Sequence, residues 1–198
     1  MVENIYFKLC MNIEKTALEG VLIIEPDVYA DERGSFMELF QETRYQEMLG
    51  LSADEHFLQD NFSVSKKGTL RGLHYQAPPF AQGKLVSVLR GRVLDVAVDI
   101  RFGSPTFGKH VMVELSGDNH RQLWIPQGFA HGFTVLEDDT FFLYKCTNTY
   151  SKEHDRGVLW NDSALGIDWD NNTLIISEKD RKHPLLADIS KEFHYNNF

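Results

Sequence analysis

The segment at residues 93–100, VLDVAVDI, restricts the possible folds of this chain more than any other. Its residues alternate between two faces, one wholly apolar and one carrying two aspartates. The first face consists of Leu94, Val96, Val98 and Ile100, and the second of Val93, Asp95, Ala97 and Asp99. A period of two is the signature of a β-strand, because successive side chains point to opposite sides of the sheet. The segment therefore predicts a strand.

Most of the middle of the chain is strand-like. The run at 84–90, KLVSVLR, is joined to this strand by Gly91 and Arg92, which give a tight-turn signal. Further strands are predicted at 109–115, 121–125, 132–136 and 140–147. Several short strands separated by turn signals favour a sandwich or barrel over a parallel α/β sheet. We therefore expect an all-β fold.

Helical patterns are confined to two places. Residues 43–50, TRYQEMLG, predict one short helix that ends at Gly50, and the chain from about residue 177 to 198 looks helical again. No repeat, low-complexity segment or Pro/Gly-rich linker divides the chain, and 198 residues suit one domain. We expect a single domain over residues 1–198, with an N-terminal extension over 1–17.

Charge and composition narrow the class of protein. A net charge of −9 argues against a nucleic-acid binder, which usually carries a basic stripe, although a few placed cations suffice for a phosphate ligand. The N-terminus lacks the apolar run of a signal peptide, and no stretch approaches the ~20 apolar residues of a membrane span. Cys10 and Cys146 form no CxxC pair, which fits a reducing compartment. These features predict a cytoplasmic protein without nucleic-acid or membrane partners.

The first candidate for chemistry is GTLRGLHYQ, residues 68–76. His74 is either a half-buried histidine with satisfied ring nitrogens or a general base, since histidine is the side chain whose ordinary pKa lies nearest neutrality. Arg71 and His74 differ in parity, so a flat strand would point them to opposite faces. A bulge at Gly72 would bring them to the same face.

The second candidate is IPQGFAHGF, residues 125–133, in which Pro126, Gly128 and His131 resemble the second motif of cupin barrels. In metal-dependent cupins this histidine is a ligand, and the first motif supplies HxH followed by a glutamate. Here Gln76 stands where the second histidine of HxH would be. The ligand set of a transition metal is therefore incomplete, and we expect no metal.

Two later segments carry the remaining candidates. Tyr144 shares one face of a predicted strand with Phe142 and Cys146, so it is either a core tyrosine or a phenol inside an apolar pocket. Asp180 follows Ser177 by three positions, a spacing typical of a helix start. An aspartate is also what a basic histidine needs behind it to fix its tautomer.

Taken together, an ordered set of motifs resembles the deoxythymidine-diphosphate (dTDP)-4-dehydrorhamnose 3,5-epimerase family over roughly residues 18–186. An ordered set is far more specific than any single motif. The motifs are DERGSFMELF (31–40), QDNFS (59–63), LRGLHYQ (70–76), QGKL (82–85), DVAVDIR (95–101), SPTFG (104–108), RQLWIPQGFAHGF (121–133), FLYKCTN (142–148), LWND (159–162) and Lys179-Asp180.

The resemblance implies a cupin-like jelly-roll β-barrel with short peripheral helices, a homodimer, and epimerisation of a dTDP-4-keto sugar at C3 and C5 without metal or redox cofactor. The ketone at C4 acidifies the hydrogens at C3 and C5. By resemblance His74 is the base, Asp180 its carboxylate partner and Tyr144 the acid on the opposite face. Lys84 matches the position that faces the enolate oxygen, an oxyanion-hole role.

The resemblance also implies residues that hold the nucleotide. Arg33, Arg71 and Lys179 match positions near the phosphates, where a guanidinium gives bidentate contacts. The other matching substrate contacts are Glu38, Gln59, Asn61 and His131, with Tyr150 bordering the pocket. Asp155 stands where the family commonly has a glutamate, so a contact there is open.

Three alternatives remain at this stage. A 3- or 5-monoepimerase shares the base and the barrel, although the presence of Tyr144 favours the double epimerase. A metal-dependent cupin would need the missing HxH pair. A non-catalytic sugar-binding barrel would not need His74, Lys84, Tyr144 and Asp180 together.

Overall fold

Two β-sheets form the body of the protein in the computed structural model, which describes residues 11–169 and 174–197. The order of strands in the first sheet is β1 (Met11–Lys15), β2 (Leu22–Pro26), β10 (Gln122–Ile125), β7 (Lys84–Arg90), β12 (Thr140–Cys146) and β5 (Gln59–Ser65). The order in the second sheet is β13 (Asp155–Gly157), β6 (Thr69–Gln76), β11 (Phe129–Val135), β8 (Arg92–Asp99) and β9 (His110–Ser116), with β14 (Ile175–Ile176) parallel to β6. Apart from β14, all pairings in both sheets are antiparallel.

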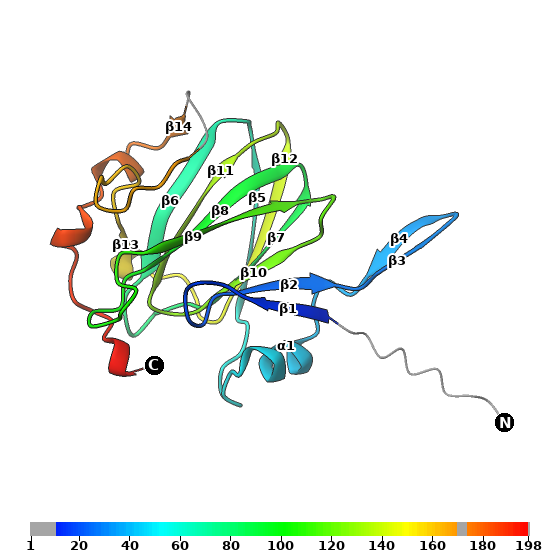
Figure 1. Cartoon of the computed structure of the whole chain (residues 1–198), viewed down its shortest axis with the longest axis horizontal. Helices are drawn as coiled ribbons and strands as arrows, with labels where there is room; N and C mark the ends of the chain where they lie inside the picture. Colours follow the sequence, from blue (N-terminus) through cyan, green and yellow to red (C-terminus); the bar gives the residue numbers. More distant parts are fainter. Residues whose placement is uncertain (1–10, 170–173, 198) are drawn as a thin grey trace.

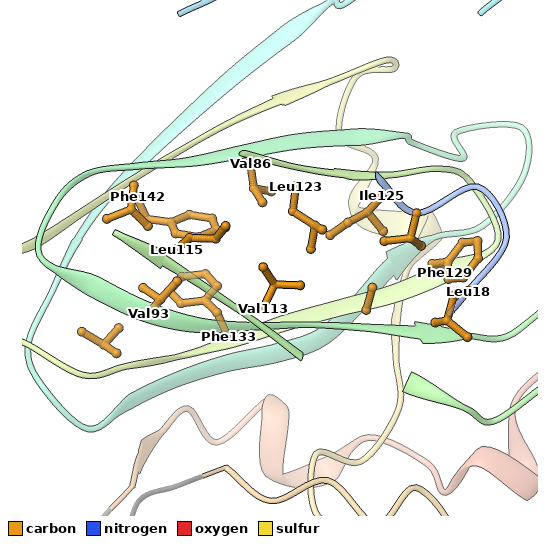
Figure 2. Packing of buried hydrophobic residues seen from close by; sticks show 14 residues of the cluster. Leu18, Val86, Val93, Val113, Leu115, Leu123, Ile125, Phe129, Phe133 and Phe142 are labelled. Carbon is orange, nitrogen blue, oxygen red and sulfur yellow. The ribbon is translucent and has the colours of Figure 1, made fainter. Parts of the chain in front are cut away.

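The two sheets face each other and enclose an apolar core (Figures 1 and 2). Figure 2 shows side chains from both sheets meeting in the space between them, among them Val86, Leu123 and Phe142 from the first and Val93, Val113, Leu115 and Phe133 from the second. Two facing antiparallel sheets of short strands are the architecture of a jelly roll. The predicted all-β, cupin-like barrel with short peripheral helices is confirmed.

Strand β8 is buried on both faces. Val93 and Ala97 belong to the barrel core, so the face that carries the aspartates points inward. Val96 and Val98 belong to a second core outside the barrel, where they pack with C-terminal residues such as Phe193. The apolar outer face of β8 therefore lets the C-terminal chain pack against the outside of the barrel; we call this chain, residues 174–197, the C-terminal coat. The inner face of the same strand places the carboxylate of Asp95 inside the barrel.

The six strands predicted from the sequence are β7, β8, β9, β10, β11 and β12. The largest difference is that β11 begins at Phe129 rather than residue 132, because the strand pairs with β8 from that residue onward. Gly91 turns the chain from the first sheet to the second rather than pairing β7 with β8. Its φ of +76° and the 2.3 Å that would separate an added Cβ from Thr140 Oγ1 leave room only for glycine.

The helix predicted at 43–50 is α1 (Glu42–Leu49), which Gly50 ends in the left-handed conformation. Its Tyr45 packs with Leu85 and Trp124 on the outer side of the first sheet. The C-terminal segment contains no α-helix over 174–197. It has instead three 3₁₀ helices, η2 (Asp180–Lys182), η3 (Leu186–Asp188) and η4 (Tyr195–Asn197), and another, η1 (Lys152–His154), follows β12.

The N-terminal region adds one strand to the first sheet and one hairpin that lies outside the barrel. Part of the predicted extension, Met11–Lys15, is β1 and pairs with β2, whereas residues 1–10 lie outside the described chain. After β2, the strands β3 (Val28–Asp31) and β4 (Gly34–Met37) form a hairpin that projects away from the barrel (Figure 1). The side chain of Phe36 on this arm is 70% exposed. Among the described residues, no helix has the length and apolar character to cross a membrane.

Candidate active site

A pocket of about 880 Å³ opens between the two sheets. Its lining includes every site residue predicted from the sequence except Arg33 and Glu38. Those that line it are His74, Tyr144, Asp180, Lys84, Gln59, Asn61, Arg71, His131, Tyr150, Asp155 and Lys179. Segments far apart in the chain are thus brought to one cavity.

Strand β6 contains the bulge that the parity of Arg71 and His74 requires. Opposite β11, His131 pairs with His74 and Phe133 pairs with Arg71, so β6 carries one residue more than its partner. Both Arg71 and His74 consequently line the pocket. Gly72 makes this possible, because a Cβ there would lie 2.5 Å from Gly132 Cα on β11.

His74 and Asp180 form a hydrogen-bonded pair, with 2.7 Å between His74 Nε2 and Asp180 Oδ1. Asp180 is buried, and its other oxygen accepts the Gly72 N–H at 3.4 Å. Burial would raise the pKa of Asp180, but His183, His74 and the Gly72 N–H lower it well below its usual range. The carboxylate is therefore ionised throughout the physiological pH range.

The pKa of His74 is lowered from its ordinary value. Burial is the largest cause, Asp180 acts against it, and the charges of Lys84 and Lys179 lower the pKa further. His74 is therefore neutral near pH 7. Since Nε2 donates to Asp180, the lone pair of Nδ1 is free to accept a proton.

Tyr144 lies on β12 in the first sheet, whereas His74 lies on β6 in the second. Its ring packs against Phe142 with centroids 6.0 Å apart, and Phe142 stacks on Phe133 at 4.0 Å. Burial raises the pKa of Tyr144 to about 12. The phenol therefore keeps its proton near neutral pH and can donate it.

Lys84, the first residue of β7, is the buried cation of the pocket. Its Nζ donates to the backbone oxygen of His74 at 3.3 Å. Burial lowers the pKa of Lys84, while Cys146, Asp95 and Asp155 oppose that shift. A desolvated ammonium beside the histidine is suited to stabilising negative charge that develops on a bound ligand.

Polar residues at the edge of the pocket are tied to one another. Asp155 accepts a hydrogen bond from the hydroxyl of Tyr150 at 3.0 Å and forms an ion pair with Lys179. Gln59 Oε1 accepts the backbone N–H of Tyr150 at 2.8 Å, and Gln59 Nε2 donates to Asn61 at 2.9 Å. Asp155 thus holds the lysine expected near a phosphate.

His131 is bound by a carboxylate of its own. Its Nε2 lies 2.9 Å from Asp95 Oδ2, and both residues are buried. In the described ranges, the one His/Cys/Asp/Glu group arranged to hold a metal consists of His74, Asp180 and His183, and it excludes His131. His131, the histidine that would be the ligand in a metal-dependent cupin, is instead bound to Asp95.

Arg33 and Glu38 lie outside the pocket. Arg33 is at the tip of the projecting hairpin, where it pairs with Asp31 and is 85% exposed. Glu38 follows β4 and pairs with Arg44 of α1. The chain by itself does not bring them to the other site residues.

Residues not predicted from the sequence include one in the pocket and one behind it. Ser63 lines the cavity with Gln59 and Asn61, and the period of two along 59–63 is a signal that would have identified it. His183 packs beside the His74–Asp180 pair. In the sequence, the only local indication that His183 lies near Asp180 is its spacing of three residues from Asp180.

A sequence model of the family described as dTDP-4-dehydrorhamnose 3,5-epimerase matches residues 15–188. The chain belongs to this family. The dTDP-4-dehydrorhamnose 3,5-epimerase of Shigella flexneri is 55% identical over 170 residues, which cover 86% of this chain and 93% of the relative. The resemblance read from the motifs is confirmed.

Solved structures of epimerases have the same fold. A dTDP-6-deoxy-D-glucose-3,5-epimerase from Legionella pneumophila Philadelphia 1, in complex with dTDP-4-keto-L-rhamnose, is 52% identical with a TM-score of 0.90, and the match covers 94% of this chain and 99% of that one. A 3'-monoepimerase from Streptomyces bikiniensis, in complex with dTDP-quinovose, is 32% identical with a TM-score of 0.80, covering 87% and 86%. The chain is thus more similar in sequence to these double epimerases than to this monoepimerase.

Proposed function

We propose that this protein inverts both C3 and C5 of dTDP-4-dehydro-6-deoxy-D-glucose, giving dTDP-4-dehydro-L-rhamnose for rhamnose synthesis. The observation that carries the proposal is one pocket with a neutral, carboxylate-bound His74 on one sheet and a protonated Tyr144 on the other. Family membership supports the substrate, since the Legionella relative was crystallised with dTDP-4-keto-L-rhamnose.

His74 acts as the base in the proposed reaction. Its Nδ1 takes a proton from the carbon beside the C4 ketone, and Asp180 stabilises the imidazolium that forms. The electron pair of the broken C–H bond passes to the ketone oxygen as an enolate. Lys84 stabilises this oxygen, and no metal or redox cofactor is needed.

Tyr144 completes each inversion. Because it comes from the facing sheet, its hydroxyl can deliver a proton to the side of the sugar opposite His74. Protonation of the carbon collapses the enolate to the ketone. The phenolate is then reprotonated, directly or through solvent, by the proton that His74 removed.

The cations at the pocket edge bind the diphosphate in this proposal. Arg71, which now donates to Ser65, and Lys179, which now pairs with Asp155, are free to exchange these partners for phosphate oxygens. Asp155 is one methylene shorter than glutamate and reaches Lys179 all the same. Gln59, Asn61, His131 and Tyr150 contact the sugar or nucleotide.

The projecting hairpin supports a homodimer. Arg33 and the 70%-exposed Phe36 lie on an arm that contacts nothing in its own pocket. An arm of this kind can reach a second copy, as expected of a twofold assembly. We propose that Arg33 and Glu38 contribute to the pocket of the second copy. We also propose that the protein works in the cytoplasm.

Proton NMR of the 4-keto sugar with enzyme in deuterium oxide tests the function. The double epimerase should incorporate deuterium at both C3 and C5 and give the L-rhamno product. Label and inversion at one carbon alone would replace the proposal by the monoepimerase alternative. If neither carbon incorporates deuterium, the epimerase proposal is rejected and the alternative of a non-catalytic sugar-binding barrel remains.

A further inference from the structure

A second histidine, His183, lies directly behind the His74–Asp180 pair. Its Nε2 is 3.7 Å from Asp180 Oδ1, too far for a hydrogen bond. The side chain is 10% exposed, and Nε2 has no hydrogen-bond partner within the part of the chain that the structure describes. A buried, unpaired ring nitrogen aimed at a carboxylate is costly, so this one calls for an explanation.

The imidazole of His183 occupies space that is open only because residue 157 is glycine. A Cβ on Gly157 would lie 2.5 Å from His183 Nε2, so any other residue there would displace the imidazole. On its other side the ring packs edge-on against His74, with centroids 5.5 Å apart at 73°. His183 is thus held beside two potential metal ligands.

We propose that His74, Asp180 and His183 bind a zinc ion that reversibly inhibits the enzyme. Their three ligand atoms, two imidazole nitrogens and one carboxylate oxygen, lie within 4.8 Å of one another. Tetrahedral zinc with bonds of about 2.0–2.2 Å needs ligand atoms about 3.3–3.6 Å apart. The observed separations from Asp180 Oδ1, 2.7 Å to His74 and 3.7 Å to His183, lie on either side of this value.

The type of ligand selects the type of ion. Imidazole and carboxylate together suit zinc, whereas magnesium prefers a nearly complete shell of oxygen ligands. His74 and Asp180 also line the pocket. The pocket therefore gives the ion access and supplies water for its fourth position.

The charges around the site keep the binding reversible. Lys84 and Lys179 lie near His74 and oppose a cation. Asp155 offsets Lys179 through their ion pair, and the Asp180 carboxylate supplies a negative ligand. Zinc should therefore bind less tightly than in a structural site with four protein ligands.

Inhibition follows from the tautomer of His74. In the free protein Nε2 carries the proton and Nδ1 has the lone pair. A neutral imidazole bound to zinc through Nε2 carries its proton on Nδ1, so it has no lone pair left to act as a base. This consequence rests on the proposed function, but zinc binding itself does not.

The test uses the full chain, first freed of metal with a chelator and desalted. Isothermal titration with zinc should give one site, and rising free zinc should abolish exchange of the 4-keto sugar until chelator restores it. His183→Phe keeps a planar ring but removes both nitrogens. It should bind zinc at least about 100-fold more weakly than the parent, since loss of even an outer-shell partner can cost that much. Its own rate without zinc is the baseline against which its inhibition by zinc is measured. His56→Phe removes a surface histidine as the matched control and should bind as the parent does.

Two outcomes would overturn the site: a parent protein that binds no zinc, or a His183→Phe variant inhibited at the same free zinc concentration as the parent. If His183→Phe does not fold, His183→Gln replaces it, with the same expectation. X-ray absorption of the zinc-loaded parent should show two imidazole ligands, and a spectrum with none would contradict the proposal. Zinc binding that depends on His183 in a protein without epimerase activity would uphold the site and reject the proposed function instead.

Discussion

Replacing Tyr144 with phenylalanine removes one hydroxyl and leaves the ring that packs on Phe142. The fold should therefore be unaffected, and the melting temperature should stay close to that of the parent. The expected loss is confined to proton delivery. A positioned acid contributes about 10²–10⁴-fold, so the epimerisation barrier should rise by about 2.7–5.4 kcal/mol.

Deuterium exchange should behave differently from epimerisation in this variant. His74 and its bond to Asp180 are untouched, so the proton can still be removed. After exchange with solvent, His74 can return a deuteron to the face from which the proton came. Exchange should thus persist while inversion falls.

Proton NMR in deuterium oxide measures both quantities in one sample. Loss of the C3 and C5 proton signals reports exchange, and the appearance of the L-rhamno product reports inversion. Inversion at the parent rate would mean that Tyr144 is an ordinary core tyrosine and that another donor faces His74. Equal loss of exchange and inversion would also refute the division of roles, because it would make Tyr144 necessary for abstraction.

Three further predictions use the same assay. His74→Ala should abolish exchange at both carbons, and normal exchange in this variant would exclude the proposed mechanism. A strong chelator should not lower the rate of the parent, whereas a loss restored by a divalent ion would reveal a required metal. Because burial raises the pKa of Tyr144 to about 12, the donor stays protonated where an ordinary tyrosine is half ionised, so the ratio of inversion to exchange should stay constant up to about pH 10.5. A ratio that halves near pH 10 would show that the donor titrates as an exposed phenol.

Six strands of the barrel were predictable because each is a short strand-like run bounded by turn signals. Residues 93–100 alternate so clearly that the strand is evident, yet the pattern does not tell which face is inside. The apolar face of β8 turned out to lie outside the barrel, under Phe193 and its neighbours. Only the long-range packing of the C-terminal chain decides this.

For the site, local sequence patterns identified candidate residues but could not show which of them meet in space. Arg71 and His74 could be named as candidates, and Gly72 as the place for a bulge, because these are local features. The pairing of His74 with Asp180 joins residues 106 positions apart, so no local pattern could give its 2.7 Å distance. The resemblance supplied that pairing, but it gave no sign of His183.

The C-terminal coat on the outside of β8 has a bearing on how the enzyme can be inactivated. Asp180 belongs to this coat, which is fastened through Leu186, Ile189 and Phe193 to the outer core. The histidine it must reach is on a barrel strand. One member of the His74–Asp180 pair is therefore positioned by packing on the far side of the sheet from the pocket. With Asp180 in its proposed role, damage to that outer layer should inactivate the enzyme even where every residue proposed to contact the sugar is intact.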